Sequence, residues 1–125
     1  MPKTLPVLAF LLALFFSSGA AGQNSVIVLS FDALDSALSA AHEQSIKESI
    51  LPLLTENKDG FIEVRAYASG DSGQASAARR ISLERALAVE AFLLAQGVDE
   101  RRLYLRPLGP APEDSDYVEI AVLKP

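Results

Sequence analysis

Residues 78–97 read ARRISLERALAVEAFLLAQG and decide the fold. The stretch is rich in Ala, Leu, Glu and Arg and has no glycine or proline before Gly97, so it predicts a helix that stops at this glycine. Apolar residues recur along it in two stripes: Ser82, Ala86, Val89 and Leu93 in one, and Leu83, Leu87, Ala91 and Leu94 in the other. A helix that is apolar on two sides usually packs against two neighbours, so we expect a sheet and a second helix to cover both stripes.

One charged residue of this helix lies in apolar company. Arg85 falls in the same sector as Ile81, Ala88 and Phe92. A guanidinium in such surroundings either reaches solvent at the rim by its flexible stem or needs an anionic partner, because an unpaired buried charge is very unfavourable. The sequence leaves both possibilities open.

The segments around this helix predict one further helix and four strands. Periodic apolar residues from the cap candidates Asp35 or Ser36 onward predict an amphipathic helix that Pro52 kinks or ends near Leu51. β-Branched or alternating runs predict strands at residues 26–31, 61–68, 103–108 and 117–123. The order strand, helix, strand, helix, strand, strand favours a two-layer α/β sandwich, with both helices on one face of a mixed sheet.

The first 22 residues have the layout of a secretory signal peptide. Lys3 precedes an apolar run at residues 5–16, and small residues follow, with cleavage expected after Ala20, Ala21 or Gly22. This run is too short to span a bilayer comfortably, so a retained membrane anchor is the less favoured alternative. We therefore expect a domain at residues 24–125 that is exported to the periplasm or cell envelope and meets the membrane only through its signal sequence.

Composition excludes several classes of function. Loss of Lys3 leaves 10 basic and 16 acidic residues, a formal charge of −6, which does not suit nucleic-acid binding. With no cysteine and one histidine, His42, which we place on the first helix, the chain lacks material for a transition-metal site or a His-based triad. GDSG at residues 70–73 matches the nucleophile segment of chymotrypsin-like proteases only superficially. We predict no metal, no cofactor and no catalysis.

A family resemblance begins in the middle of the chain. A strand containing Ile62, a glycine-bearing turn and the pattern (L/I)SxxRAxxVxxxL are present, the last formed by Ile81, Ser82, Arg85, Ala86, Val89 and Leu93. This run resembles the peptidoglycan-associating domain of outer membrane protein A, the OmpA-like family, in a shortened variant. GVDERRL at residues 97–103 and YVEIAVL at residues 117–123 are similar to later parts of that domain, so the resemblance spans essentially the whole mature chain.

The resemblance implies a βαβαββ fold with sheet order 1-4-2-3. It also implies a pocket where the second strand ends, beside the start of the central helix, in which an aspartate and an arginine bind the diaminopimelate side chain of the peptidoglycan stem peptide. Arg85 matches the family arginine. The family aspartate aligns with Gly70, and the nearest acid is Asp71. The expected ligand-binding residues are therefore Asp71 and Arg85, framed by Ser69, Gly70 and Ser82.

The chain departs from the family pattern before its last strand. The Asn-Arg-Arg of typical members is replaced by Ser115, Asp116 and Tyr117, so two positive charges are lost. Together with the second apolar stripe on the central helix, this replacement supports an alternative hypothesis. In it the domain keeps its fold but binds another envelope protein instead of the cell wall, and Arg79, Arg80, Arg101 and Arg102 form a basic rim for an acidic partner.

Overall fold

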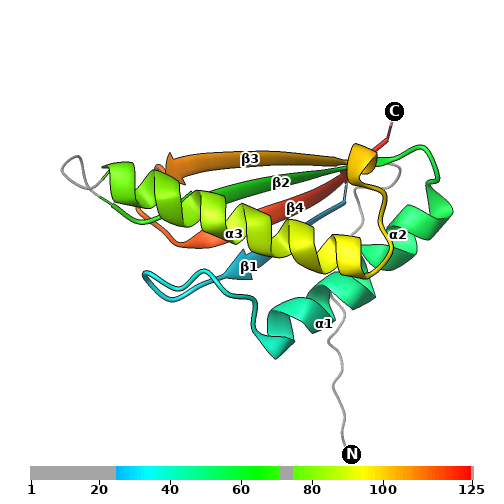
Figure 1. Cartoon of the computed structure of the whole chain (residues 1–125), viewed down its shortest axis with the longest axis horizontal. Coiled ribbons are helices and arrows are strands. Elements are labelled where there is room, and N and C mark those ends of the chain that lie inside the picture. Colours follow the sequence, from blue (N-terminus) through cyan, green and yellow to red (C-terminus); the bar gives the residue numbers. More distant parts are fainter. Residues whose placement is uncertain (1–24, 71–74, 125) are drawn as a thin grey trace, which may run out of the picture.

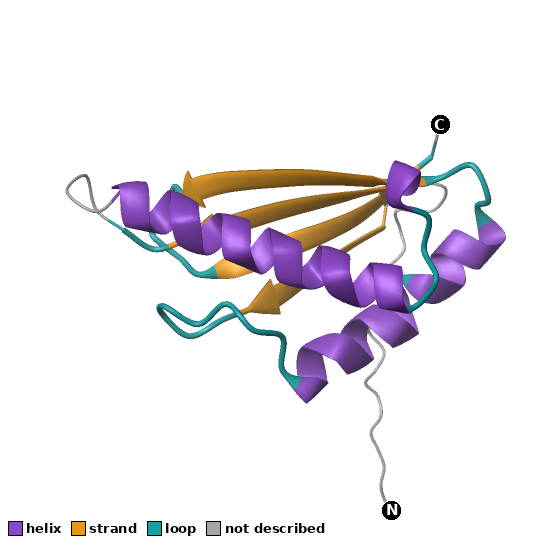
Figure 2. Ribbon diagram, viewed as in Figure 1, coloured by secondary structure: helices purple, strands orange, loops and turns teal. Residues whose placement is uncertain are grey.

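The structure, a computed structural model, describes residues 25–70 and 75–124, which form two layers (Figure 1). The strands are β1 (Ser25–Ser30), β2 (Phe61–Ala68), β3 (Leu103–Pro110) and β4 (Tyr117–Leu123). The helices are α1 (Ala40–Ser49), α2 (Leu51–Glu56) and α3 (Ala75–Ala95), with a 3-10 turn, η3 (Glu100–Arg102), before β3. All three helices lie on one side of the sheet, which confirms the predicted sandwich (Figure 2).

The sheet has the order β1-β4-β2-β3, as the resemblance implies. β4 runs antiparallel to both of its neighbours, β1 and β2, whereas β2 and β3 are parallel. Tyr67, near the end of β2, lies opposite Tyr117, the first residue of β4. The segment that follows β2 and the loop that precedes β4 are therefore brought together at one edge of the molecule.

The core lies between the sheet and the helix layer, with α3 over its centre and Ile46, Ile50 and Leu54 contributed by α1, the α1–α2 junction and α2. Alternate residues of β2, namely Ile62, Val64, Ala66 and Ala68, are fully buried, as their period of two predicts. From α3 the first stripe is buried against them, and its members Ser82, Ala86, Val89 and Leu93 are each 0% exposed. Burial of this stripe is the main apolar contribution of α3 to the fold.

The expectation that the second stripe of α3 is also covered is wrong. Leu83, Leu87 and Leu94 are 42%, 45% and 39% exposed. Helix α1 packs beside the sheet near β1, and no element within residues 25–70 and 75–124 lies over the outer side of α3 (Figure 1). The molecule thus has one layer of helices, and this layer leaves a row of leucines accessible to solvent.

The helix boundaries follow from cap chemistry. α1 begins later than the predicted Asp35 or Ser36, because Ser39 is its N-cap: the Ser39 hydroxyl accepts from the His42 amide, and the His42 ring accepts from the Ser39 amide. His42 therefore lies on the first helix, as predicted. Pro52 in the first turn of α2 coincides with the predicted break. Gly97, with φ of +93°, follows the end of α3.

Candidate functional site

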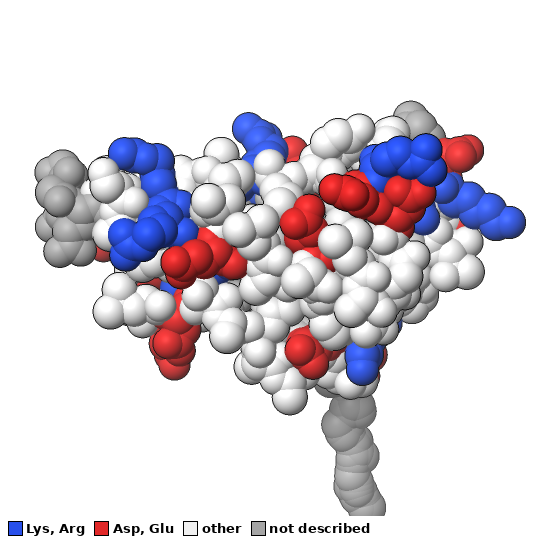
Figure 3. Space-filling view, viewed as in Figure 1, with Lys and Arg blue, Asp and Glu red and all other residues white. Residues whose placement is uncertain are grey.

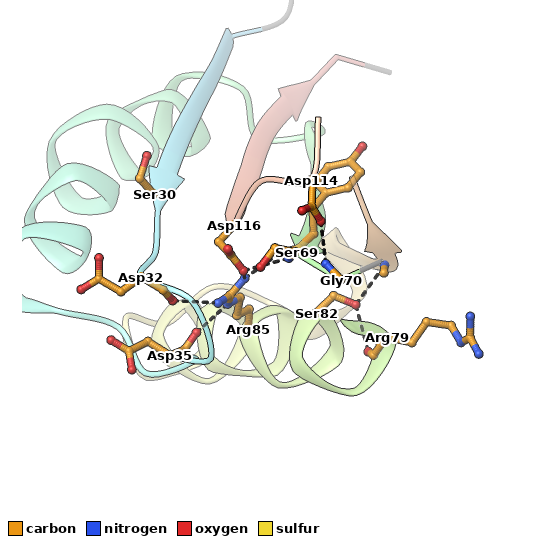
Figure 4. A network of polar contacts seen from close by, with 12 residues as sticks. Ser30, Asp32, Asp35, Ser69, Gly70, Arg79, Ser82, Arg85, Asp114 and Asp116 are labelled. Carbon is orange, nitrogen blue, oxygen red and sulfur yellow. Dashed lines mark hydrogen bonds and ion pairs between the residues drawn. The ribbon is translucent and has the colours of Figure 1, made fainter. Parts of the chain in front are cut away.

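Arg85 is the central residue of a buried polar network at the end of β2 (Figure 4). Its side chain is 0% exposed, so of the two possibilities that the sequence left open, extension to the rim is wrong. Helix geometry explains the burial, because residue 85 lies one turn from Ile81, Ser82 and Val89, which all face the sheet. An arginine enclosed in this way must have every polar group paired.

The guanidinium donates four hydrogen bonds to segments that are far apart in the sequence. Nε donates to the carbonyl of Asp35 at 2.6 Å, and Nη2 donates to the carbonyl of Asp32 at 3.1 Å. Nη1 donates both to the carbonyl of Tyr67 at 2.8 Å and to Oδ1 of Asp116 at 2.9 Å. Arg85 therefore connects α3 with the β1–α1 loop, with β2 and with the start of β4.

The β1–α1 loop is shaped to direct its carbonyls at the guanidinium. Leu34 adopts a left-handed φ of 73°, a conformation that is costly for a bulky residue, and the Asp35 amide donates to the Asp32 carbonyl across this turn. The ring of Phe31 lies 4.8 Å from the guanidinium carbon and adds a cation–π contact.

Two carboxylates of the β3–β4 loop complete the network. Oδ1 of Asp116 accepts from the Ser69 amide at 2.9 Å as well as from Arg85. Oδ1 of Asp114 accepts from the Gly70 amide at 2.7 Å, and Asp114 has a left-handed φ of 58°. The backbone amides of Ser69 and Gly70, which directly follow β2, are thus each paired with an acid of the same chain.

The pairing fixes the charge of Asp116. Burial alone raises the pKa of this carboxyl, but the hydrogen bonds from the Ser69 amide and hydroxyl and from the Arg85 guanidinium outweigh burial and hold the pKa below its usual value. Asp116 is therefore an anion at neutral pH, and Arg85 and Asp116 form an ion pair in which the side chain of Asp116 is only 13% exposed.

A pH dependence of stability follows from this pKa. The pKa of an aspartate in the unfolded state is about 3.9. A carboxyl whose pKa is lower than this in the folded state stabilises the fold above the unfolded-state pKa, and this stabilisation is lost as the pH falls through the folded-state pKa. We expect the free energy of unfolding, measured by urea titration between pH 7 and pH 2.5, to fall below about pH 4. Asp99, whose pKa Arg101 lowers to about 2, titrates in an overlapping range. The informative quantity is therefore the difference between wild type and Asp116→Asn. Parallel curves for the two would contradict the expectation.

The structure places the other predicted site residues as follows. Ser69 and Gly70 lie beside Arg85 and contribute backbone amides. Ser82 is buried, and its hydroxyl donates to the carbonyl of Arg79 at 2.9 Å and accepts from the amide of Gly109 at 3.1 Å, so it ties α3 to β3. Asp71, the predicted partner of Arg85, lies outside the described residues.

Asp116 and Asp114 are members of the network that the sequence interpretation missed. From the sequence alone, Asp116 counts only as the loss of a family arginine. A reversal of charge at a position next to a buried arginine is itself a signal for an ion pair, and here it would have found the partner.

An open hollow borders the network on its outer side. It has a volume of about 310 Å³, and its lining includes the acids Glu113, Asp116 and Glu119 together with Tyr117. Arg85 is not part of this lining. Asp116 therefore lies between the hollow and the guanidinium, and the acids of the hollow suit a cationic rather than an anionic group.

The predicted basic rim is wrong. Arg79 and Arg80 lie in the second turn of α3, whereas Arg101 and Arg102 follow its end, so the helix between them spans about 24 Å. Figure 3 shows Lys and Arg gathered mainly near the two ends of this face. Arg102 is also engaged internally, with hydrogen bonds to the carbonyls of Gly60 and Asn57 at 2.9 and 2.6 Å.

Residues 25–70 and 75–124 contain no group of three or more His, Cys, Asp or Glu side chains that could hold a metal ion. Among the same residues, no helix combines the length and the apolar character needed to cross a bilayer.

Comparisons with solved structures find the same fold in bacterial envelope proteins. The OmpA-like domain of FopA1 from Francisella tularensis is 18% identical with a TM-score of 0.69, over 82% of this chain and 73% of that one. The periplasmic domain of MotB from Helicobacter pylori is 20% identical with a TM-score of 0.63, over 82% of each chain. The peptidoglycan-associated lipoprotein from Burkholderia pseudomallei is 13% identical with a TM-score of 0.60, over 76% of this chain and 88% of that one.

Curated proteins give no significant match. The model of the OmpA family, by contrast, matches residues 30–118, which is more than half of the sequence. The match runs from the end of β1 to the start of β4 and includes the helices, β2, β3 and the buried arginine network. The fold, the sheet order and this match agree, and the chain belongs to the OmpA family.

Proposed function

We propose that this protein is a binding module of the bacterial cell envelope that associates non-covalently with the stem peptide of peptidoglycan. Residues 1–22 act as its signal peptide, and residues 24–125 work in the periplasm. Membership of the OmpA family and the likeness to a peptidoglycan-associated lipoprotein support this proposal. The observation that carries it is the donor set at the end of β2, where one guanidinium and two backbone amides already hold carboxylates.

Each predicted residue has a role in the proposed complex. Arg85 and the amides of Ser69 and Gly70 would bind the carboxylate of a diaminopimelate head group, since charge-assisted donors of this kind favour an anion. Asp71, which directly follows Gly70, would bind the ammonium group, and the acidic hollow beside Asp116 adds negative charge for the same purpose. Ser82 would act indirectly, by fixing the first turns of α3 against β3.

Co-sedimentation with purified sacculi tests this proposal. We expect wild type to sediment with sacculi, and we expect Arg85→Lys, which keeps the charge but loses the planar fork, to sediment roughly tenfold less. Arg106→Lys is the matched control, because Arg106 lies in β3 with a side chain that is 54% exposed and paired with Glu63. Circular dichroism at the assay temperature verifies that all three proteins are folded.

The possible results separate the role of Arg85 from binding itself. Equal sedimentation of wild type and Arg85→Lys would remove Arg85 from the site. No sedimentation of wild type would end the proposal that this domain binds the cell wall.

A second candidate function has an observation of its own. The exposed row of Leu83, Leu87 and Leu94 on α3 is suited to bind another envelope protein through apolar contacts. Size-exclusion chromatography with light scattering tests the simplest form, self-association. A concentration-dependent increase in mass that Leu87→Lys abolishes would support this function, and a strict monomer at high concentration would count against it.

A further inference from the structure

We infer that Asp116 is an internal ligand of the carboxylate site: it occupies the position that a carboxylate of a bound molecule would take and so sets how tightly such a molecule binds. The physiological side of this inference rests on the proposed function. The chemical side of the inference states that the position accepts a free carboxylate once Asp116 is removed. This side rests on the geometry alone.

The donors around Asp116 form an anion-binding site. Arg85 is fully buried, and its Nη1 lies 2.9 Å from Oδ1 of Asp116. The Ser69 amide lies 2.9 Å from the same oxygen. Proteins bind the carboxylates of other molecules with the same arrangement, in which a fixed guanidinium and a backbone amide donate to one oxygen.

Without the β3–β4 loop, the backbone amides of Ser69 and Gly70 would lack their acceptors. The Gly70 amide is paired by Asp114 in the same way as the Ser69 amide is paired by Asp116. Both acids belong to the loop between β3 and β4, and no buried side-chain polar atom of the described residues lacks a partner. The loop therefore supplies anions to donors that the end of β2 and α3 leave free.

Asp116 is the member of the ion pair that solvent reaches. Its side chain is 13% exposed and borders the open hollow of about 310 Å³, whereas Arg85 has no access to that hollow. A molecule that enters from the hollow meets Asp116 before it can reach the guanidinium. Asp116 must turn away before an external carboxylate can bind Arg85.

The test of the chemical side is rescue by a small carboxylate. Asp116→Ala removes the internal ligand and leaves the guanidinium and the Ser69 amide without an anion. At pH 7 and equal ionic strength, sodium acetate in place of sodium chloride should raise the thermal midpoint of Asp116→Ala by roughly 5 °C, in a saturable manner, because acetate binds the folded state. Wild type, in which the Asp116 carboxylate still fills the position, should show no such increase. Equal midpoints of Asp116→Ala in acetate and chloride would overturn the inference.

A second variant keeps the inference testable if Asp116→Ala does not fold. Asp116→Asn retains the shape and the acceptor oxygen but loses the negative charge, so it competes less well with an external carboxylate. We expect it to sediment with sacculi severalfold more than wild type. Glu100→Gln, which removes one negative charge from the exposed turn η3 at the opposite end of the sheet, should leave sedimentation near the wild-type level. Equal or weaker sedimentation of Asp116→Asn, when wild type does bind, would contradict the inference.

The two arms distinguish the inference from the proposed function. If neither wild type nor any variant sediments, the proposed function fails, and acetate rescue of Asp116→Ala alone decides the carboxylate inference. If Asp116→Ala does not fold, acetate-induced NMR shifts of the Ser69 amide in Asp116→Ser decide it instead. Shifts in Asp116→Ser that are absent in wild type support the inference. Their absence overturns it.

Discussion

Replacement of Arg85 by methionine is expected to lower the free energy of unfolding by about 3–5 kcal/mol. The change removes the partner of Asp116, whose carboxylate is largely buried, and it leaves the inward carbonyls of Asp32, Asp35 and Tyr67 without their donors. Unpaired charges and carbonyls in such positions are among the most destabilising defects that one substitution can produce. Since small domains have a total stability of about 5–15 kcal/mol, much of the margin would be lost.

Urea unfolding followed by circular dichroism measures this effect, and Arg106→Met provides the matched control. Arg106 also forms an ion pair, but its side chain is 54% exposed, so its replacement should cost less than about 1 kcal/mol. The double variant Arg85→Met/Asp116→Leu should recover part of the loss, because it removes both charges together. Equal stabilities of Arg85→Met and Arg106→Met would show that the network does not stabilise the fold.

Replacement of Leu93 by alanine is expected to cost about 2–5 kcal/mol. Leu93 is 0% exposed in the main core cluster between α3 and the sheet, so the change leaves a cavity as well as less buried apolar surface. The neighbouring residue gives an internal comparison, because Leu94 is 39% exposed on the outer stripe. Leu94→Ala should cost less than about 1 kcal/mol.

This pair of variants also tests the unequal burial of the two stripes of α3. Chemical denaturation of both proteins under the same conditions gives the comparison directly, and helix propensity cancels because the substitution is the same. A cost for Leu94→Ala as large as that for Leu93→Ala would mean that the outer stripe is covered in solution, as it would be by a partner or a second copy.

Most of the fold could be predicted from the sequence because the relevant signals are local. The central helix, the strands and the break at Pro52 follow from propensity, periodicity and the geometry of proline, which act within a few residues. The covering of the second stripe could not be predicted in this way. Whether a neighbour lies over Leu83 and Leu87 depends on where the short helix α1 packs, and its own sequence does not specify that position.

Only part of the candidate site could be predicted from the sequence. That Arg85 requires an anion follows from its apolar surroundings, but the identity of the partner depends on strand register. Asp116 lies 31 residues from Arg85 and reaches it because Tyr67 pairs with Tyr117. The carbonyls of Asp32 and Asp35 join through a turn that contains a left-handed leucine, which no local pattern predicts.

The location of β4 between β1 and β2 has a consequence for how the protein forms. Of the four described strands, β1 emerges first from the ribosome, yet its one neighbour among them is β4, the last of the four to be made. Contacts between segments so distant along the chain close slowly, since a long loop must be ordered before any pairing is gained. The sheet of the nascent polypeptide therefore stays incomplete, with β1 unpaired, until β4 has been synthesised.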